Sequence, residues 1–295
     1  MSPLGKGGIR QDKLSSWLER AIKKFCAASP ENTLRNEASE RAWEKPLVGF
    51  SNGADPLYLR IKEDIGPFYL TPLETFMLAF PQAQASPEDL TVVSWILPQT
   101  RATKADNRQE TAFPAERWVR SRHFGEMFNA VLRRHVVETL QAGGFAAVAP
   151  VDAPFWSQEV SARYGLASRW SERHAAHIAG LGTFGLCDGL ITPRGKAMHC
   201  GSVVAQIPIP PTIRPYNDHH EYCLHFSQGI CGKCIKRCPA GAISAAGHDK
   251  NKCWDYLREV TAPYGRERFG IEAYGCGLCQ TGVPCESRIP VKGRD

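Results

Sequence analysis

The chain has 295 residues, of which 43% are hydrophobic and 22% are charged, and its net charge is +6. This composition excludes a disordered chain, a collagen-like fibre and a coiled coil. No segment approaches the roughly 20 apolar residues that a transmembrane helix needs. The first residues contain neither an apolar run nor a twin arginine, so we expect no export signal, a cytoplasmic protein and no membrane partner.

Helices and strands are predicted to follow one another in mixed order over the first 210 residues. In chain order we predict a helix over 11–29, a strand over 91–97, a helix over 123–142, a strand over 145–148, a helix over 171–179, and strands over 190–192 and 200–209. Gly143 and Gly144 end the second helix, and Ser171 caps the third. This mixed order favours an α/β or α+β layer.

A proline-rich stretch, IPIPPTIRP at 207–215, is typical of a linker. It separates a first domain, residues 1–210, from a second, residues 211–295. The second domain holds most of the cysteines.

Eight of the eleven cysteines fall between Cys223 and Cys285. A disulfide framework is typical of small exported domains, so metal binding or redox chemistry explains these eight better. The first run has the spacing C-x7-C-x2-C-x3-C-P, and a second set follows from Cys253 onward. Bacterial two-cluster ferredoxins carry C-x2-C-x2-C-x3-C-P, in which the last cysteine ligates the other cluster.

The ferredoxin crossover divides the eight cysteines into two sets of four. One 4Fe–4S cluster would be held by Cys223, Cys231, Cys234 and Cys285, and the other by Cys238, Cys253, Cys276 and Cys279. The pattern departs from ferredoxins at Gln228, where the first cysteine of the run would stand, so Cys223 must substitute across a longer loop.

Two alternatives to the clusters remain open. Cys231, Cys234, Cys276 and Cys279 also form the C-x2-C…C-x2-C pattern of a zinc site, which leaves the other four cysteines without a role. The eight could also be reactive free thiols. Elsewhere, Gly180, Gly182 and Gly185 spell G-x-G-x-x-G, but this motif follows a predicted helix where a dinucleotide fold requires a strand. We interpret it as a helix end and a tight turn.

The segment SERHAAHIAGLGTFGLCDGLITPRGKAMHCGSVV, 171–204, resembles the core of epoxyqueuosine reductases and corrinoid reductive dehalogenases. The resemblance covers roughly residues 90–285 and is strongest over 171–204 and 223–285. It implies an α+β fold, with a nitroreductase-like α/β domain followed by a two-cluster bacterial ferredoxin-like module. In this family a corrinoid, such as cobalamin, lies between the two parts.

The resemblance also implies site residues. Positions Gly182, Gly185, Cys187, Asp188 and Gly189 would line the corrinoid. Epoxyqueuosine reductases carry an aspartate before the helix that opens this core, and Asp152 has the matching order in the chain, although its distance to Glu172 is longer than the pattern allows. Reductive dehalogenases use a tyrosine with a basic neighbour, and Tyr164 beside Arg163 or Arg169 is the parallel candidate.

The expected function is an oxidoreductase that receives electrons from an external donor, such as ferredoxin or flavodoxin. A tRNA nucleoside, an organohalide or another small molecule would be the substrate. The alternative is a corrinoid-free 4Fe–4S electron-transfer protein or subunit, in which the first 210 residues form a docking platform. Cobalt content separates these two hypotheses.

Overall fold

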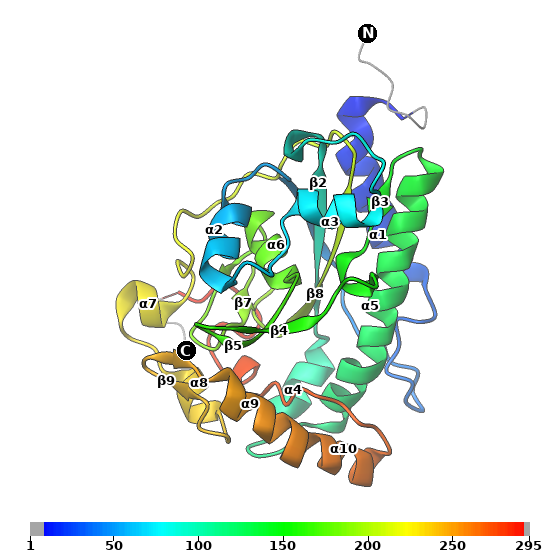
Figure 1. Ribbon diagram of the computed structural model, residues 1–295. Coiled ribbons are helices and arrows are strands. Elements are labelled where there is room, and N and C mark those ends of the chain that lie inside the picture. Colours follow the sequence, from blue (N-terminus) through cyan, green and yellow to red (C-terminus); the bar gives the residue numbers. More distant parts are fainter. Residues whose placement is uncertain (1–8, 292–295) are drawn as a thin grey trace.

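A four-stranded sheet lies at the centre of the computed structural model, which describes residues 9–291 (Figure 1). The strand order is β1, β2, β8 and β3, and every neighbouring pair is antiparallel. These strands span Leu47–Asn52, Thr91–Pro98, Met198–Ala205 and Ala147–Val148. Helices precede, separate and follow the strands, so the prediction of a mixed α and β architecture is confirmed.

Strand β2 is buried along its whole length. Successive side chains of a strand point to opposite faces of the sheet. Val93 and Trp95 accordingly pack into one hydrophobic core, whereas Val92 and Ile96 pack into apolar clusters on the other face. The sheet therefore needs helices on both sides.

Two long helices cover the first face, namely α1 (Leu14–Ala28) and α5 (Glu116–Ala142) (Figure 1). The other face is covered by α2 (Leu57–Ile65), α3 (Pro72–Ala79) and α6 (Glu172–Ile178). Helix α4, Arg101–Gln109, packs against α5. Single-turn 3₁₀ helices span Gln11–Lys13, Pro87–Asp89, Pro150–Asp152 and Leu278–Gln280.

Short hairpins and helices complete the chain. The paired strands are β4 with β5, β6 with β7, and β9 with β10, over Gln158–Ser161, Gly165–Ser168, Thr183–Phe184, Leu190–Ile191, Ile243–Ser244 and Gly247–His248. The cysteine-rich segment carries α7 to α10, over Leu224–Gln228, Lys233–Arg237, Lys250–Tyr256 and Ala262–Phe269. A π-helical turn, Leu257–Thr261, joins α9 to α10, which packs on α5. Within residues 9–291, no helix combines the length and apolar character needed to cross a bilayer.

The elements with clear periodicity match their predictions. Helix α6 begins after Ser171, whose hydroxyl accepts a hydrogen bond from the backbone N–H of His174. Helix α5 begins seven residues before the predicted start, because its first turns bury Trp118 and Val119 against the C-terminal segment. The predicted strands at 145–148 and 190–192 shorten to two residues each.

The proline-rich stretch 207–215 has neither helix nor strand, as expected of a linker, yet it packs onto the sheet. Ile207 and Ile209 are buried in the main core. The backbone N–H of Thr212 donates to the carbonyl of Phe50 in β1 at 2.9 Å. The boundary between residues 1–210 and 211–295 stays a prediction.

Candidate functional site

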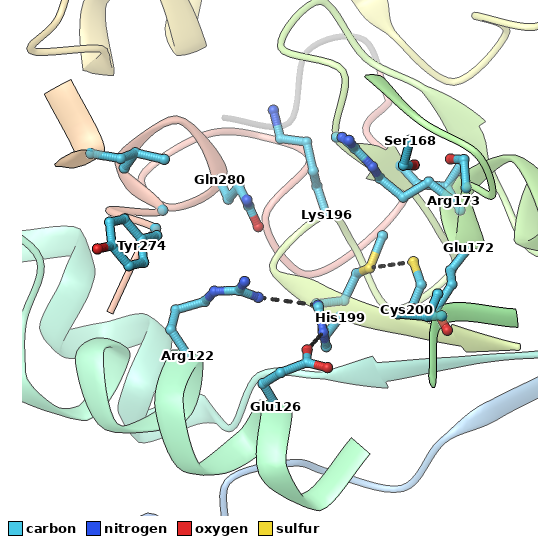
Figure 2. A pocket seen from close by; sticks show the side chains of 18 of the residues that line it. Arg122, Glu126, Ser168, Glu172, Arg173, Lys196, His199, Cys200, Tyr274 and Gln280 are labelled. Carbon is cyan, nitrogen blue, oxygen red and sulfur yellow. Dashed lines mark hydrogen bonds and ion pairs between the residues drawn. The ribbon is translucent and has the colours of Figure 1, made fainter. Parts of the chain in front are cut away.

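A cavity of about 480 Å³ lies between β8, α5, α6 and the loop near Tyr274 (Figure 2). The charged and titratable side chains that line it are Arg122, Glu126, Glu172, Arg173, Lys196, His199, Cys200 and Tyr274. Most of them come from the sheet and from helices that pack on it. The fold therefore holds a polar, partly enclosed site on rigid elements, which is the usual setting of a binding site.

One wall of the cavity is a chain of three side chains. Arg122 and Glu126 lie one turn apart on α5 and both face His199 of β8 (Figure 2). Arg122 Nη1 lies 3.1 Å from His199 Nδ1, and His199 Nε2 contacts the Glu126 carboxylate. Although burial alone would raise it, His199, Arg133 and Arg122 lower the pKa of Glu126 to about 2.

Three carboxylates surround the buried guanidinium of Arg133. Its Nε and Nη2 donate to the two oxygens of Asp152 at 2.8 and 2.9 Å, and Nη2 also donates to Glu126 at 3.1 Å. The third, Glu172, lies 3.6 Å from Nη1, which makes no hydrogen bond. Arg133 therefore stabilises the ionised forms of Asp152 and Glu126 by direct hydrogen bonds but makes none to Glu172.

Glu172 is the most enclosed of the three carboxyl groups. Its side chain is only 13% exposed, and it accepts one hydrogen bond, from the backbone N–H of Ser202 at 3.0 Å. Burial raises the pKa of Glu172 to about 8, and the attraction of Arg133 offsets only part of that effect. Glu172 lines the cavity, so a neutral carboxyl group faces whatever binds there at neutral pH.

Neither of the two predicted catalytic residues lines the main cavity. Asp152 is outside the cavity lining, and both of its oxygens accept hydrogen bonds from Arg133. The hydroxyl of Tyr164 donates to Asp64 at 2.6 Å in a separate cavity, and burial, followed by the hydrogen bond to Asp64, raises the pKa of Tyr164 to about 12. The structure does not bring Asp152 and Tyr164 together, and their catalytic roles stay predictions.

Arg173 joins the main cavity to two others. Cavities of about 260 and 410 Å³ adjoin it, and Arg173 lines all three. Ser168, Ser171 and Leu257 are shared by the first two. Tyr164 and Asp188 line the last one. Their shared residues place the three cavities next to one another, from β8 to the α2 side of the fold, and together they are called the groove.

The glycines of the predicted corrinoid site have different surroundings. A Cβ on Gly182 would lie 2.3 Å from the carbonyl oxygen of Ile191, so Gly182 is needed for close packing of the β6–β7 hairpin. Gly185 packs against the Ile191 side chain in the same hairpin. Gly189 lines the main cavity and Asp188 lines the 410 Å³ cavity. Only part of the predicted set therefore borders the groove.

The cysteines of the first predicted set meet in one cavity. Cys223, Cys231, Cys234 and Cys285 all line it, although Cys285 is more than fifty residues from the other three. All four are free thiols. Their convergence fits a cluster ligated from several directions.

The second predicted set lies beside the first. The pKa of the Cys276 thiol is raised to about 11, chiefly by burial and also by Cys253 and Cys238 close to it. Cys279 neighbours Cys276 and also Cys187, which contacts Cys234 of the first set. Among residues 9–291, no three His, Cys, Asp or Glu side chains are placed to hold a single metal ion.

The turn that precedes β8 brings Lys196 to the cysteines. Backbone N–H groups of Lys196 and Ala197 donate to the carbonyls of Cys285 and Glu286 at 2.7 and 3.2 Å. A Cβ on Gly195 would lie 2.2 Å from the Glu286 oxygen, and its φ is +84°, so only glycine suits this approach. As a result Lys196 is 2% exposed and its Nζ lies 3.1 Å from the Cys187 sulfur.

Sequence reasoning missed five residues of the site, namely Arg122, Glu126, Glu172, Lys196 and His199. Glu172 stands in the first turn of α6, where an acidic residue usually complements the helix dipole. Lys196 and His199 stand in PRGKAMH, which has the composition of a solvated turn. The spacing of Arg122 and Glu126 by four residues was the one available signal, because it places both on one helix face.

The chain shares sequence with one class of oxidoreductase over part of its length. It is 34% identical over 119 residues to the epoxyqueuosine reductase of Bacillus anthracis, a match that covers 39% of this chain and 29% of that protein. The epoxyqueuosine reductase of Bacillus subtilis is 29% identical over 130 residues, which cover 42% of this chain and 30% of that protein. The predicted resemblance to epoxyqueuosine reductases is thereby confirmed, while the chain spans about three tenths of these relatives. No family model matches the chain.

Two solved structures are also similar. A selenomethionine-labelled epoxyqueuosine reductase aligns with a TM-score of 0.49 and 18% identity, over 96% of this chain and 70% of that one. A catabolic reductive dehalogenase aligns with a TM-score of 0.49 and 15% identity, over 84% of this chain and 31% of that one.

Proposed function

We propose that the chain is an iron–sulfur, corrinoid-dependent reductase related to epoxyqueuosine reductases. One observation carries the proposal: cysteines with ferredoxin-like spacing gather in two neighbouring sets beside a polar groove. The nitroreductase-like identity of the first part and the ferredoxin-like identity of the second belong to this proposal. The similarity to curated epoxyqueuosine reductases supports it.

The residues present fit both kinds of cofactor. One 4Fe–4S cluster is assigned to Cys223, Cys231, Cys234 and Cys285, and the other to Cys238, Cys253, Cys276 and Cys279. The corrinoid would occupy the three neighbouring cavities together, whose volumes are about 480, 260 and 410 Å³. When bound, the clusters supply single electrons and the corrinoid supplies a strongly reducing, nucleophilic cobalt.

The arginines of the groove would orient the bound molecules. Arg122 and Arg173 form no salt bridge with any residue between 9 and 291, so their positive charges can attract an anionic group of a bound molecule. Arg173 Nη1 is anchored on the Asp188 carbonyl at 2.5 Å. The Trp156 and Trp170 side chains also line the main cavity.

We assign the proton to Glu172. A reductive cleavage needs a proton for the product, and a carboxyl group that is neutral near pH 7 and lines the cavity can give it. Arg133 stays behind Glu172 and stabilises the carboxylate once the proton has left. Asp152 and Tyr164 are retained as alternative donors.

The external electron donor would be an acidic carrier such as ferredoxin or flavodoxin. Lys233 and Lys236 are exposed on α8, on either side of Cys234, and form no salt bridge with any described residue. Positive charge beside a cluster steers a negatively charged partner toward it. The cytoplasmic location stays a prediction.

The test is anaerobic turnover of the reconstituted protein with reduced ferredoxin and added cobalamin. The candidate substrates are a tRNA stem loop that carries epoxyqueuosine and a set of haloaromatic acids, with products identified by mass spectrometry. A reduced product that needs both cobalamin and ferredoxin supports the proposal. Rapid oxidation of ferredoxin by the clusters without cobalt binding or product would replace it with the corrinoid-free electron-transfer protein.

A further inference from the structure

Lys196 separates the main cavity from the first cysteine set. Among the described residues it is the one that lines both cavities. Its side chain is one of the largest that are almost completely buried. In Figure 2 the aliphatic stem borders the cavity, and the ammonium extends away from Glu126 and His199. Burying a lysine ammonium costs free energy unless an anion lies beside it. A negatively charged group is therefore expected next to Lys196.

The groups around the ammonium are sulfur atoms. Lys196 Nζ donates to Cys187 at 3.1 Å, and it forms no salt bridge with a carboxylate between residues 9 and 291. The thiols of Cys285, Cys279 and Cys234 are its other neighbours. Cys234 and Cys285 belong to the first predicted cluster set, and Cys279 belongs to the second. Lys196 is therefore a buried cation beside cysteines of both sets.

The surroundings fix the position of this charge. The backbone of Lys196 is hydrogen-bonded to Cys285, and a Cβ on Gly189 would lie 2.8 Å from the Lys196 Cδ atom. The stem is thus held between two parts of the chain and has little freedom to turn toward solvent. Cys187 is not needed as a ligand in either set of four, which leaves it to hold the ammonium.

We propose that Lys196 is a positioning residue that raises the reduction potential of the iron–sulfur clusters. The inference rests on the proposed function, because it requires clusters at the two cysteine sets. A cluster gains one negative charge when it accepts an electron, so a nearby fixed cation stabilises the reduced form more than the oxidised form. Lys196 would thereby ease the entry of electrons and hold them beside the cavity.

The experiment is an EPR-monitored redox titration of anaerobically reconstituted protein. The variants are Lys196→Met and Lys196→Gln, which remove the charge, and Lys196→Arg, which keeps it. Lys104→Met is the matched control, because Lys104 is also buried but lines neither cavity. Iron per chain is measured on every sample before the titration.

We expect the neutral variants to retain iron while at least one cluster becomes at least tenfold harder to reduce. For a one-electron couple, this corresponds to a potential lower by about 59 mV. Lys196→Arg should have a reduction potential close to that of the unaltered protein, and Lys104→Met should leave the potentials unchanged. Unchanged potentials in both neutral variants would overturn the proposal. Loss of iron from the neutral variants would also overturn it, because it would assign Lys196 to cluster assembly. If the unaltered protein binds no iron, the proposed function itself fails.

Discussion

Arg133 Nη1 lies 3.6 Å from the nearer carboxylate oxygen of Glu172, beyond hydrogen-bond distance, while the same guanidinium donates twice to Asp152. The guanidinium is thus committed to Asp152 and Glu126. Arg133 is therefore a charged neighbour of Glu172 but donates no hydrogen bond to it. This arrangement explains how a buried carboxyl group beside an arginine can hold a proton, and it has consequences for pH dependence.

Glu172→Gln should change how stability depends on pH. The folded chain binds a proton at Glu172 more tightly than the unfolded chain, since the pKa rises from 4.5 to about 8 on folding. The stability that this group contributes is complete below pH 4.5 and is lost as the pH rises to about 8, at up to about 1.4 kcal/mol per pH unit. Urea unfolding of both proteins at several pH values between 5 and 8 measures the difference.

Relative to Glu172→Gln, the unaltered protein should therefore lose stability steadily across this range. Glu138→Gln, at an exposed position of α5, is the control and should follow the unaltered protein. Parallel curves for the Glu172 variant and the unaltered protein would show that Glu172 is ionised throughout. In turnover assays, Glu172→Gln should lose at least about a hundredfold in kcat, the usual contribution of a general acid.

Gly195→Ala should release the segment around Cys285 from the turn before β8. An alanine Cβ would collide with the Glu286 backbone, and φ is +84°, which costs about 1–2 kcal/mol for a non-glycine residue. We expect a loss of stability above that strain alone, together with loss of about half of the iron. Gly270→Ala is the matched control, because its φ is +68° and no atom lies within 4 Å of the added Cβ. Equal effects of the two variants on iron content would contradict the packing argument.

Cys234→Ser and Cys279→Ser test the two ligand sets separately. Each should remove about half of the iron, since each set holds a four-iron cluster. Each should also destabilise the cysteine-rich segment, because metal binding contributes to folding there. Cys26→Ala, at a buried cysteine in the main core, should keep the full iron content. A full complement of iron in either serine variant would refute the assigned sets.

Ser168→Trp should block the junction between the main cavity and the 260 Å³ cavity. Ser168 lines both, and an indole there would divide the groove. We expect cobalamin to be washed out of this variant while iron is retained. Val160→Trp, in the same β4–β5 hairpin but 81% exposed, should keep cobalt. Retention of cobalt by Ser168→Trp would exclude the groove as the corrinoid site.

Local patterns predicted the elements that are themselves locally determined. The continuous apolar run of β2 and the helical spacing in α1 depend on neighbouring residues. Strand β1 was missed because LVGFSN is short and is fixed by pairing with β2. The extent of α5 was underestimated because Trp118 and Val119 are buried against a segment some 150 residues away.

The candidate site likewise contains residues that local sequence patterns predict and residues that they do not. The spacing of Cys231 and Cys234 is local, and it predicted that these two cysteines would lie close together. Glu172 and Lys196 could not be found from the sequence, because their burial depends on Arg133 and on the pairing of the Gly195 turn with Cys285. The sequence around such residues gives no sign of their role, because their burial and their charged neighbours arise only when the chain folds.

The most direct test of the central claim is elemental analysis of the anaerobically reconstituted protein, offered cobalamin and then desalted. Two 4Fe–4S clusters and a corrinoid predict about eight iron, about eight sulfide and about one cobalt per chain. Zinc in place of iron would contradict the account. Iron and sulfide without cobalt would leave the clusters in place but refute the corrinoid-dependent reductase.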